Sequence, residues 1–200
     1  MKKTILKTAL ITLGSVIFAL AAVFGVMALF FPGALADVFD KAGDYSFSVA
    51  MYERQYNADK SLESLKNLVI KLDEEKNAEK TDKYSTIFVD DSGYSDYVAE
   101  NGVDLFGSVE LSNEYFFGKC VISKVNGGGF DKALTYTEKY LETFGYTEFN
   151  PARLTISQKI NSLSAENKTA LKDYLEDYRS SHTLSADETA RINGDISLLG

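Results

Sequence analysis

The chain has 200 residues, a formal net charge of −8, one Cys, one His and no Trp. This length fits one domain, or one domain with an anchor. The acidic balance argues against nucleic acid as a partner, because nucleic-acid binding needs basic patches that displace counterions. A single Cys excludes an internal disulfide, and a single His excludes sites that need two imidazoles on one chain.

An apolar segment near the N-terminus predicts a transmembrane helix. Residues 9–31 are mostly Leu, Ile, Val, Ala and Phe, and carry no charge. As a helix they measure about 34 Å, which is enough to cross a hydrocarbon core of about 30 Å. Lysines flank this span only on its N-terminal side, at positions 2, 3 and 7, and the first charged residue after it is Asp37. The positive-inside rule therefore places residues 1–8 in the cytoplasm and residues 33–200 outside the cell membrane.

A cleaved signal peptide is the competing interpretation of the same segment. Ala34, Leu35 and Ala36 match the small-x-small cleavage pattern. The apolar run is longer than the about 7–15 residues of a signal-peptide core. Cleavage after Ala36 would also remove the start of the next predicted helix. We therefore expect an uncleaved anchor.

Residues 33–200 predict an all-α domain. They hold all 29 acidic residues and 18 of the 21 basic ones, a formal charge of −11. Apolar residues recur at helical spacing, as in Leu65, Leu68 and Leu72. Antiparallel helix pairs are expected at 33–56, 62–88 and 113–144.

The segments between and after these pairs give weaker patterns. Residues 89–112 predict a looser stretch with one short helix near 95–100. Three helices are expected between Pro151 and Ile192, the last of them opening with a capping box at Ser185 and Glu188. Gly194 is expected to stop that helix.

Two stretches share small residues, aromatic residues and glycine turns at similar spacing. The first supplies Ala36, Phe39, Gly43, Asp44, Tyr45, Ser48 and Tyr52, and the second supplies Gly118, Val121, Gly129, Phe130 and Ala133. Both resemble the tetratricopeptide repeat, a helix–turn–helix unit of 34 residues. The second stretch departs from the family pattern, because Val121 replaces an aromatic residue and the turn is longer. The alternative is a plain helical bundle whose turns contain a glycine and an aromatic residue by chance.

The resemblance implies an irregular solenoid of stacked helix pairs. In such a solenoid the first helix of each pair contributes to an exposed binding face. It also implies that Gly118 and Ala133 face each other where the two helices of the third pair cross.

Residues able to do chemistry do not form a catalytic, cofactor-binding or metal-binding pattern. His182 lies in a predicted loop, where we expect it to be solvated, because a Ser-His pair needs an orienting acid. Cys120 lies among apolar residues of a predicted helix, where a buried structural thiol is expected. We therefore predict no catalytic residue, no cofactor and no metal site.

Two functions are compatible with these features. The first is a membrane-anchored, extracytoplasmic helical-repeat module of a bacterial envelope. It binds another envelope protein or peptide and has no catalytic activity, with Tyr94 and Tyr97 as candidate interface residues. The alternative is a carboxylate-based enzyme, or a solute- or cation-binding domain, built from Asp90, Asp91 and Asp96. The repeat resemblance favours the first.

Overall fold

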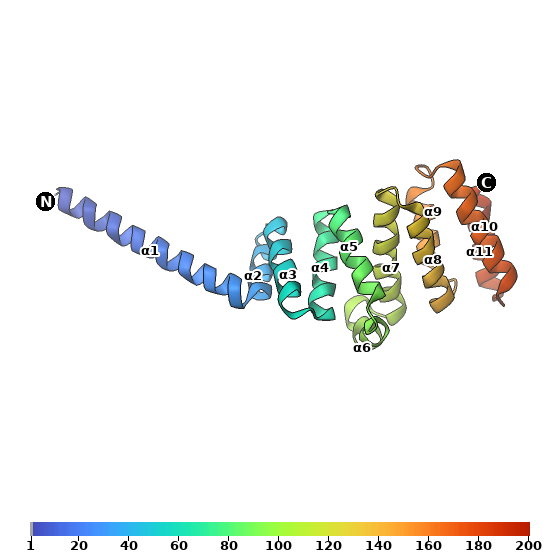
Figure 1. Cartoon of the computed structure of the whole chain (residues 1–200), viewed down its shortest axis with the longest axis horizontal. Helices are drawn as coiled ribbons and strands as arrows, with labels where there is room; N and C mark the ends of the chain where they lie inside the picture. The colour runs from blue at the N-terminus through green and yellow to red at the C-terminus, as the bar shows by residue number, and fades with distance from the viewer. Residues whose placement is uncertain (1) are drawn as a thin grey trace. The chain divides into compact units, whose positions relative to one another are not determined.

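The computed structural model describes residues 2–200, which form eleven α-helices and no strand (Figure 1). The predicted all-α class is confirmed. The chain divides into two compact units, Met1–Glu75 and Lys76–Gly200. Met1, the first residue of the predicted cytoplasmic segment 1–8, lies outside the described residues.

Four helices belong to the first unit and seven to the second, counted over residues 2–200. The first unit has α1 (Lys2–Phe30), α2 (Pro32–Lys41), α3 (Tyr45–Asp59) and α4 (Leu62–Glu75). The second unit has α5 (Ala78–Asp90), α6 (Tyr94–Phe106), α7 (Val109–Asn126), α8 (Phe130–Phe144), α9 (Pro151–Lys159), α10 (Ala165–Ser181) and α11 (Ala186–Leu199).

The helix α1 is apolar and uncovered over most of its length. Its stretch Leu10–Phe30 has a mean hydropathy of 2.5 and none of its most apolar window is buried. Within residues 2–200 it is the one helix long and apolar enough to cross a membrane. Membrane anchors and signal sequences share this property.

The helices α2 and α3 form the first predicted hairpin. Gly43 adopts the left-handed φ of +80° in the turn, and Asp44 caps α3 by accepting a hydrogen bond from the Phe47 amide at 3.1 Å. Ala36 of α2 and Ser48 of α3 are fully buried where the two helices pack. These small residues allow the close approach of a tetratricopeptide-like pair.

Three aromatic positions of the first repeat-like stretch have different environments. Tyr52 is buried and donates a hydrogen bond to Asp37 across the hairpin. Phe39 is half-buried. Tyr45 is 48% exposed at the start of α3, directly after the turn, so its predicted packing role is wrong.

The helix α4 completes the first unit by packing on α3. Its residues Leu65, Leu68, Val69 and Leu72 are buried at helical spacing. Lys71 of α4 reaches Asp40 of α2 with an Nζ–Oδ2 distance of 2.7 Å. The predicted pair at 62–88 corresponds to α4 and α5, which belong to different units, so that pairing stays a prediction.

The second unit is assembled around α7. This helix packs against α5, α6, α8 and α9, while α10 and α11 pack on each other. Its contact with α8 forms the third hairpin, in which Val121, Phe130 and Ala133 are buried. An added Cβ at Gly118 would lie 2.6 Å from Leu154 Cδ1 of α9. The near neighbour of Gly118 is thus Leu154, and not Ala133 as the repeat resemblance implied.

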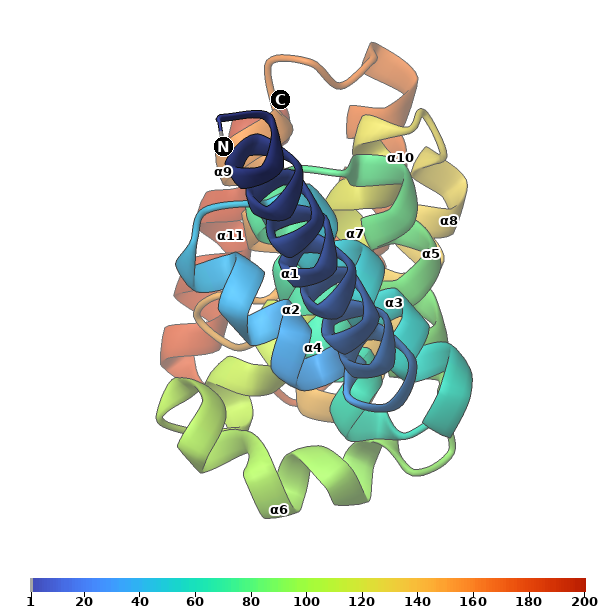
Figure 2. The same cartoon turned by 90° about the vertical axis from the view of Figure 1, so that its left-hand side faces the viewer.

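Two segments are more helical than their sequences predict. The looser stretch expected at 89–112 contains the 13-residue helix α6, which lies across one end of α5 and α7 (Figures 1 and 2). The last helix continues through Gly194 to Leu199, because Ile196 and Leu199 are buried beyond that glycine. In both segments tertiary packing overrides a weak helix propensity.

Candidate functional site

The helix α7 is buried over most of its circumference. Neighbouring residues Asn113, Glu114, Phe116, Phe117 and Gly118 are all buried, although successive residues of an α-helix point about 100° apart. The first helix of the third hairpin exposes one row of side chains at helical spacing, namely Leu111, Tyr115, Lys119 and Ile122, which are exposed or half-buried. Most of the accessible surface of this unit belongs to the helices that surround α7.

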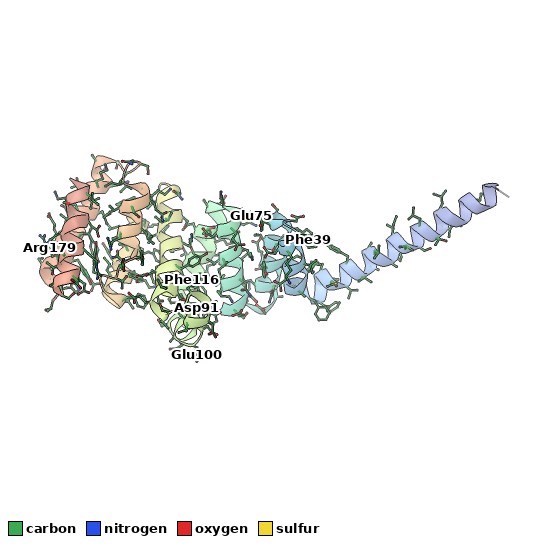
Figure 3. The ribbon with its side chains drawn as sticks, turned by 180° about the vertical axis from the view of Figure 1, so that it is seen from behind. Phe39, Glu75, Asp91, Glu100, Phe116 and Arg179 are labelled. Carbon is green, nitrogen blue, oxygen red and sulfur yellow. The ribbon has the colours of Figure 1, made fainter. Side chains whose placement is uncertain are left out.

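Aromatic rings fill the contacts around α7. Phe116 lies in the interior, with its ring 4.6 Å from that of Phe88 of α5 (Figure 3). Tyr94 of α6 packs edge-on against Phe88 and Phe117. Its hydroxyl donates to Asn113 Oδ1 at 2.9 Å.

These contacts give different outcomes for the two tyrosines that were predicted to lie at an interface. Tyr94 is only 3% exposed, so its predicted role as an exposed interface residue is wrong. Burial also raises the pKa of Tyr94 above its ordinary value. Tyr97 is half-buried, with its ring 5.9 Å from Phe88, and its interface role stays a prediction.

A buried lysine joins α7 to α5. Lys124 Nζ lies 2.5 Å from Asp82 Oδ1, and it also donates a hydrogen bond to Thr86. The same ammonium group lies 4.7 Å from the centre of the Tyr136 ring of α8. The Lys124 side chain is 6% exposed, so its charge is held in place by these partners.

Asp90, one helical turn after Thr86 on α5, joins this helix to α8. Asp90 accepts hydrogen bonds from the Tyr136 hydroxyl and from Lys139 Nζ, the latter at 2.8 Å. Lys139 also donates to the Val89 carbonyl at 3.0 Å, in the last turn of α5, where carbonyl groups lack helical partners. Partial burial acts to raise the pKa of Asp90, but the hydrogen bonds from Lys139 and Tyr136 outweigh it, so this pKa is below its ordinary value.

These six residues form one polar surface feature, which we name the α5–α8 strip. It consists of Asp82, Thr86, Asp90, Lys124, Tyr136 and Lys139. Asp82, Asp90 and Lys139 have side chains 42%, 44% and 45% exposed, so they remain open to a partner. Their internal hydrogen bonds fix the charges in place, which is typical of a surface arranged for polar recognition.

The sequence analysis did not identify the α5–α8 strip. A local signal was present on α5, where Asp82, Thr86 and Asp90 repeat every four residues and so share one helix face. A second signal was present on α8, where Lys132, Tyr136, Lys139 and Thr143 share one face. The connection between the two faces depends on pairs 46 to 50 residues apart. No local pattern reveals such pairs.

The three carboxylates of the alternative function have separate roles. Asp90 belongs to the α5–α8 strip, whereas Asp91 accepts a hydrogen bond from the Gly93 amide at 2.8 Å. Asp96 lies exposed in the first turn of α6. Among the described residues, no group of three or more His, Cys, Asp or Glu side chains is placed to hold a metal ion.

Cys120 and His182 are both integrated into the packing. Cys120 is buried, as expected, with Sγ 3.6 Å from Thr86 Oγ1, and burial raises the pKa of its thiol. His182 lies in the predicted loop, directly after α10, but its side chain is only 34% exposed, so the expected full solvation is wrong. Its ring stacks on Tyr178 at 4.0 Å between ring centres, and its Nε2 lies 3.3 Å from Glu142 Oε2 of α8.

Comparisons with known proteins give little beyond this description. No family model matches the chain, and no curated protein matches it. Among solved structures, the chain is similar to a thermophilic TPR protein of Thermus thermophilus, with 13% sequence identity and a TM-score of 0.30. That alignment covers 83% of this chain and 97% of the Thermus chain.

Proposed function

We propose that this chain is a membrane-anchored, extracytoplasmic module that binds another protein through the α5–α8 strip and has no catalytic activity of its own. The anchoring is supported by α1, whose apolar side chains are uncovered, such as Ile11 at 70% and Phe18 at 77% exposed. A continuous apolar surface of this length is unfavourable in water and fits the hydrocarbon core of a membrane. The lysines before the span support an outward orientation of the helical units.

The observation that carries the binding role is the preorganised α5–α8 strip. Lys124, its buried member, contacts both Asp82 and Tyr136, while Lys139 of α8 binds Asp90 and the Val89 carbonyl at the end of α5. Side chains already held in one geometry lose little conformational entropy on binding. The formal charge of −11 over residues 33–200 favours a partner with a basic surface, through electrostatic steering.

Site-specific photo-crosslinking in membranes from the native cells tests this binding role. A photoreactive amino acid replaces Lys132 or Thr143, which are exposed and share the α8 face with Tyr136 and Lys139. The matched control position is Asp173, exposed on α10. We expect one protein adduct from both strip positions and none from the control. Equal adducts at all three positions, or none at the strip, would contradict the proposal.

A second variant links such an adduct to the strip itself. Lys139→Ala removes the hydrogen bonds to Asp90 and Val89 while leaving the crosslinking positions intact. We expect this variant to lose most of the adduct formed from Thr143. An unchanged adduct would place the partner elsewhere on α8.

A further inference from the structure

Three phenylalanine rings join α1 to the α2–α3 hairpin. The ring of Phe24 in α1 lies 5.9 Å from that of Phe39 in α2 and 5.6 Å from that of Phe47 in α3. The rings of Phe39 and Phe47 are themselves 4.2 Å apart. Figure 3 shows Phe39 beside the end of α1. The hairpin therefore packs along the last turns of α1.

The position of Phe24 sets the depth of this cluster. Phe24 lies six residues before the end of α1, which corresponds to about 9 Å along the helix. A membrane span that ended before Phe24 would contain only the uncharged residues 8–23, about 24 Å of helix against a hydrocarbon core of about 30 Å. A span by α1 must therefore include Phe24. Phe39 and Phe47, which contact it, then lie at the level of the bilayer edge.

The face of α2 beside Phe39 is apolar. At about 100° per residue, Val38 and Ala42 lie about 100° and 60° around the helix from Phe39. Val38 is 56% exposed, and Ala42 is exposed as well. The charged residues Asp37 and Lys41 lie about 160° away from Phe39, on the opposite side of the helix.

The face of α3 beside Phe47 has the same character. Ala50, Met51 and Arg54 follow Phe47 at positions i+3, i+4 and i+7, so they share its face. Ala50 is exposed and Met51 is half-buried. Arg54, at the end of this row, is the one charged member of the face, and long basic side chains extend towards lipid phosphates from apolar surroundings.

The carboxylates of α2 are turned away from this face. Asp37 accepts a hydrogen bond from Tyr52 of α3, and Asp40 pairs with Lys71 of α4. Anionic groups that would oppose contact with a lipid surface are thus held on the α3–α4 side of the hairpin.

We propose that the α2–α3 hairpin lies in the outer interface of the bilayer, with this apolar face against the lipid chains. The lipid-facing residues are Val38, Phe39, Ala42, Phe47, Ala50 and Met51, with Arg54 at the headgroups. The occupant of the face is lipid because the face is continuous with the apolar surface of α1 through Phe24. This inference rests on the proposed anchoring by α1 and extends it from a single span to a span with an interfacial hairpin.

Single tryptophans test the inference, because the chain contains no Trp. The full-length protein is reconstituted in phosphatidylcholine vesicles with and without bromine on the lipid chains, which quenches nearby Trp fluorescence. The test variants are Val38→Trp and Ala50→Trp. Lys41→Trp is the matched control on the opposite side of α2, and Phe18→Trp reports the anchor.

We expect the brominated lipid to quench Phe18→Trp. We also expect it to quench both test variants at least about twofold more strongly than Lys41→Trp, because a helix is roughly 10 Å across and an interfacial helix buries only one side. Absence of quenching at Phe18→Trp would remove the anchor and this inference with it. Quenching at Phe18→Trp, with the test variants equal to Lys41→Trp, would leave the anchor intact and overturn the interfacial hairpin. Blue-shifted but unquenched emission from Val38→Trp would also overturn it, since protein, such as a second copy, would then cover the face.

Discussion

Ser112 donates a hydrogen bond from its Oγ to the Gly102 carbonyl at 2.7 Å, and both residues are buried where α6 meets α7. Gly102 is the residue that permits this approach. A Cβ added to it would lie 3.0 Å from Val109 Cα and 3.2 Å from Ser112 Oγ. Main chain cannot move aside as a flexible side chain can, so the absence of a side chain at Gly102 sets the distance between the two helices.

Gly102→Ala is therefore expected to destabilise the protein. The higher helix propensity of Ala contributes up to about 1 kcal/mol, but overpacking against backbone typically costs about 1–3 kcal/mol. Gly194→Ala is the control, since Gly194 lies within α11 and nothing is within 4 Å of its added Cβ. Thermal unfolding of the full chain in detergent should show a lower Tm for Gly102→Ala and a raised Tm for Gly194→Ala. A rise in both would show that α6 and α7 are not in close contact at Gly102.

Gly118→Leu is expected to destabilise the second unit through its contact with Leu154. The larger side chain meets Leu154 Cδ1, which already lies 2.6 Å from the position of an added Cβ, at a cost of about 1–3 kcal/mol. Leu154→Ala in the same chain should relieve part of this cost, with a coupling energy of at least about 0.5 kcal/mol. Urea unfolding of the two single variants and the double variant measures that coupling.

Ala133→Leu supplies the comparison for this double-mutant cycle. Ala133 is 1% exposed, so the substitution should also destabilise by overpacking. We expect no rescue of Ala133→Leu by Leu154→Ala, because Leu154 is the neighbour of Gly118. Rescue of Ala133→Leu alone would place Leu154 against Ala133 and contradict its assignment as the neighbour of Gly118.

Glu114→Gln is expected to change how stability depends on pH. Burial raises the pKa of Glu114 above its ordinary value of 4.5, and the hydrogen bonds from Thr147 and the Phe149 amide offset this only in part. Because the folded-state pKa is above the unfolded one, the contribution of Glu114 to stability is fully present below pH 4.5. It is lost as the pH rises through the folded-state pKa.

At neutral pH the variant should therefore be more stable than the parent chain, and the difference should disappear in acid. Urea midpoints measured across this pH range test it, with Glu100→Gln, an exposed residue of α6, as the control. A parallel shift of the whole stability curve would show that Glu114 acts through packing and not through its charge.

The predicted topology can be tested by proteolysis. With lysines at the N-terminal end of α1 and none within the apolar span, the helical units should lie outside the cytoplasmic membrane. Protease added to intact protoplasts should degrade residues 40–200 and spare an N-terminal tag. Full protection of residues 40–200 would reverse the orientation. A mature N-terminus at Asp37 in the soluble fraction would identify α1 as a signal peptide.

Local sequence signals predicted those parts of the fold that depend on neighbours along the chain. The capping box at Ser185 and Glu188 forms as expected, and Gly43 and Asp44 make the turn between α2 and α3. The helix α6 was predicted too short, at 95–100, because Gly102 and its polar neighbours have weak helix propensity. Burial of Tyr94 and Val98 against neighbouring helices stabilises α6 despite this propensity.

The candidate site was less accessible to sequence analysis for a related reason. In the sequence, Lys124 is an ordinary basic residue near a helix end, and such a side chain is expected to be solvated. Its burial follows from the positions of α5 and α8 on either side of α7, which place Asp82 and Tyr136 beside it. Only the tertiary arrangement converts separate polar residues of three helices into one surface.

The junction between α1 and α2 consists of a single residue, Phe31. A flexible linker of many residues would let a tethered domain sample a hemisphere whose radius grows with linker length. With one residue and the ring contacts of Phe24, the first unit of an anchored chain has almost no such reach. It would meet only partners that diffuse within the same thin layer next to the membrane, so encounters become two-dimensional, and their frequency depends on surface density instead of bulk concentration.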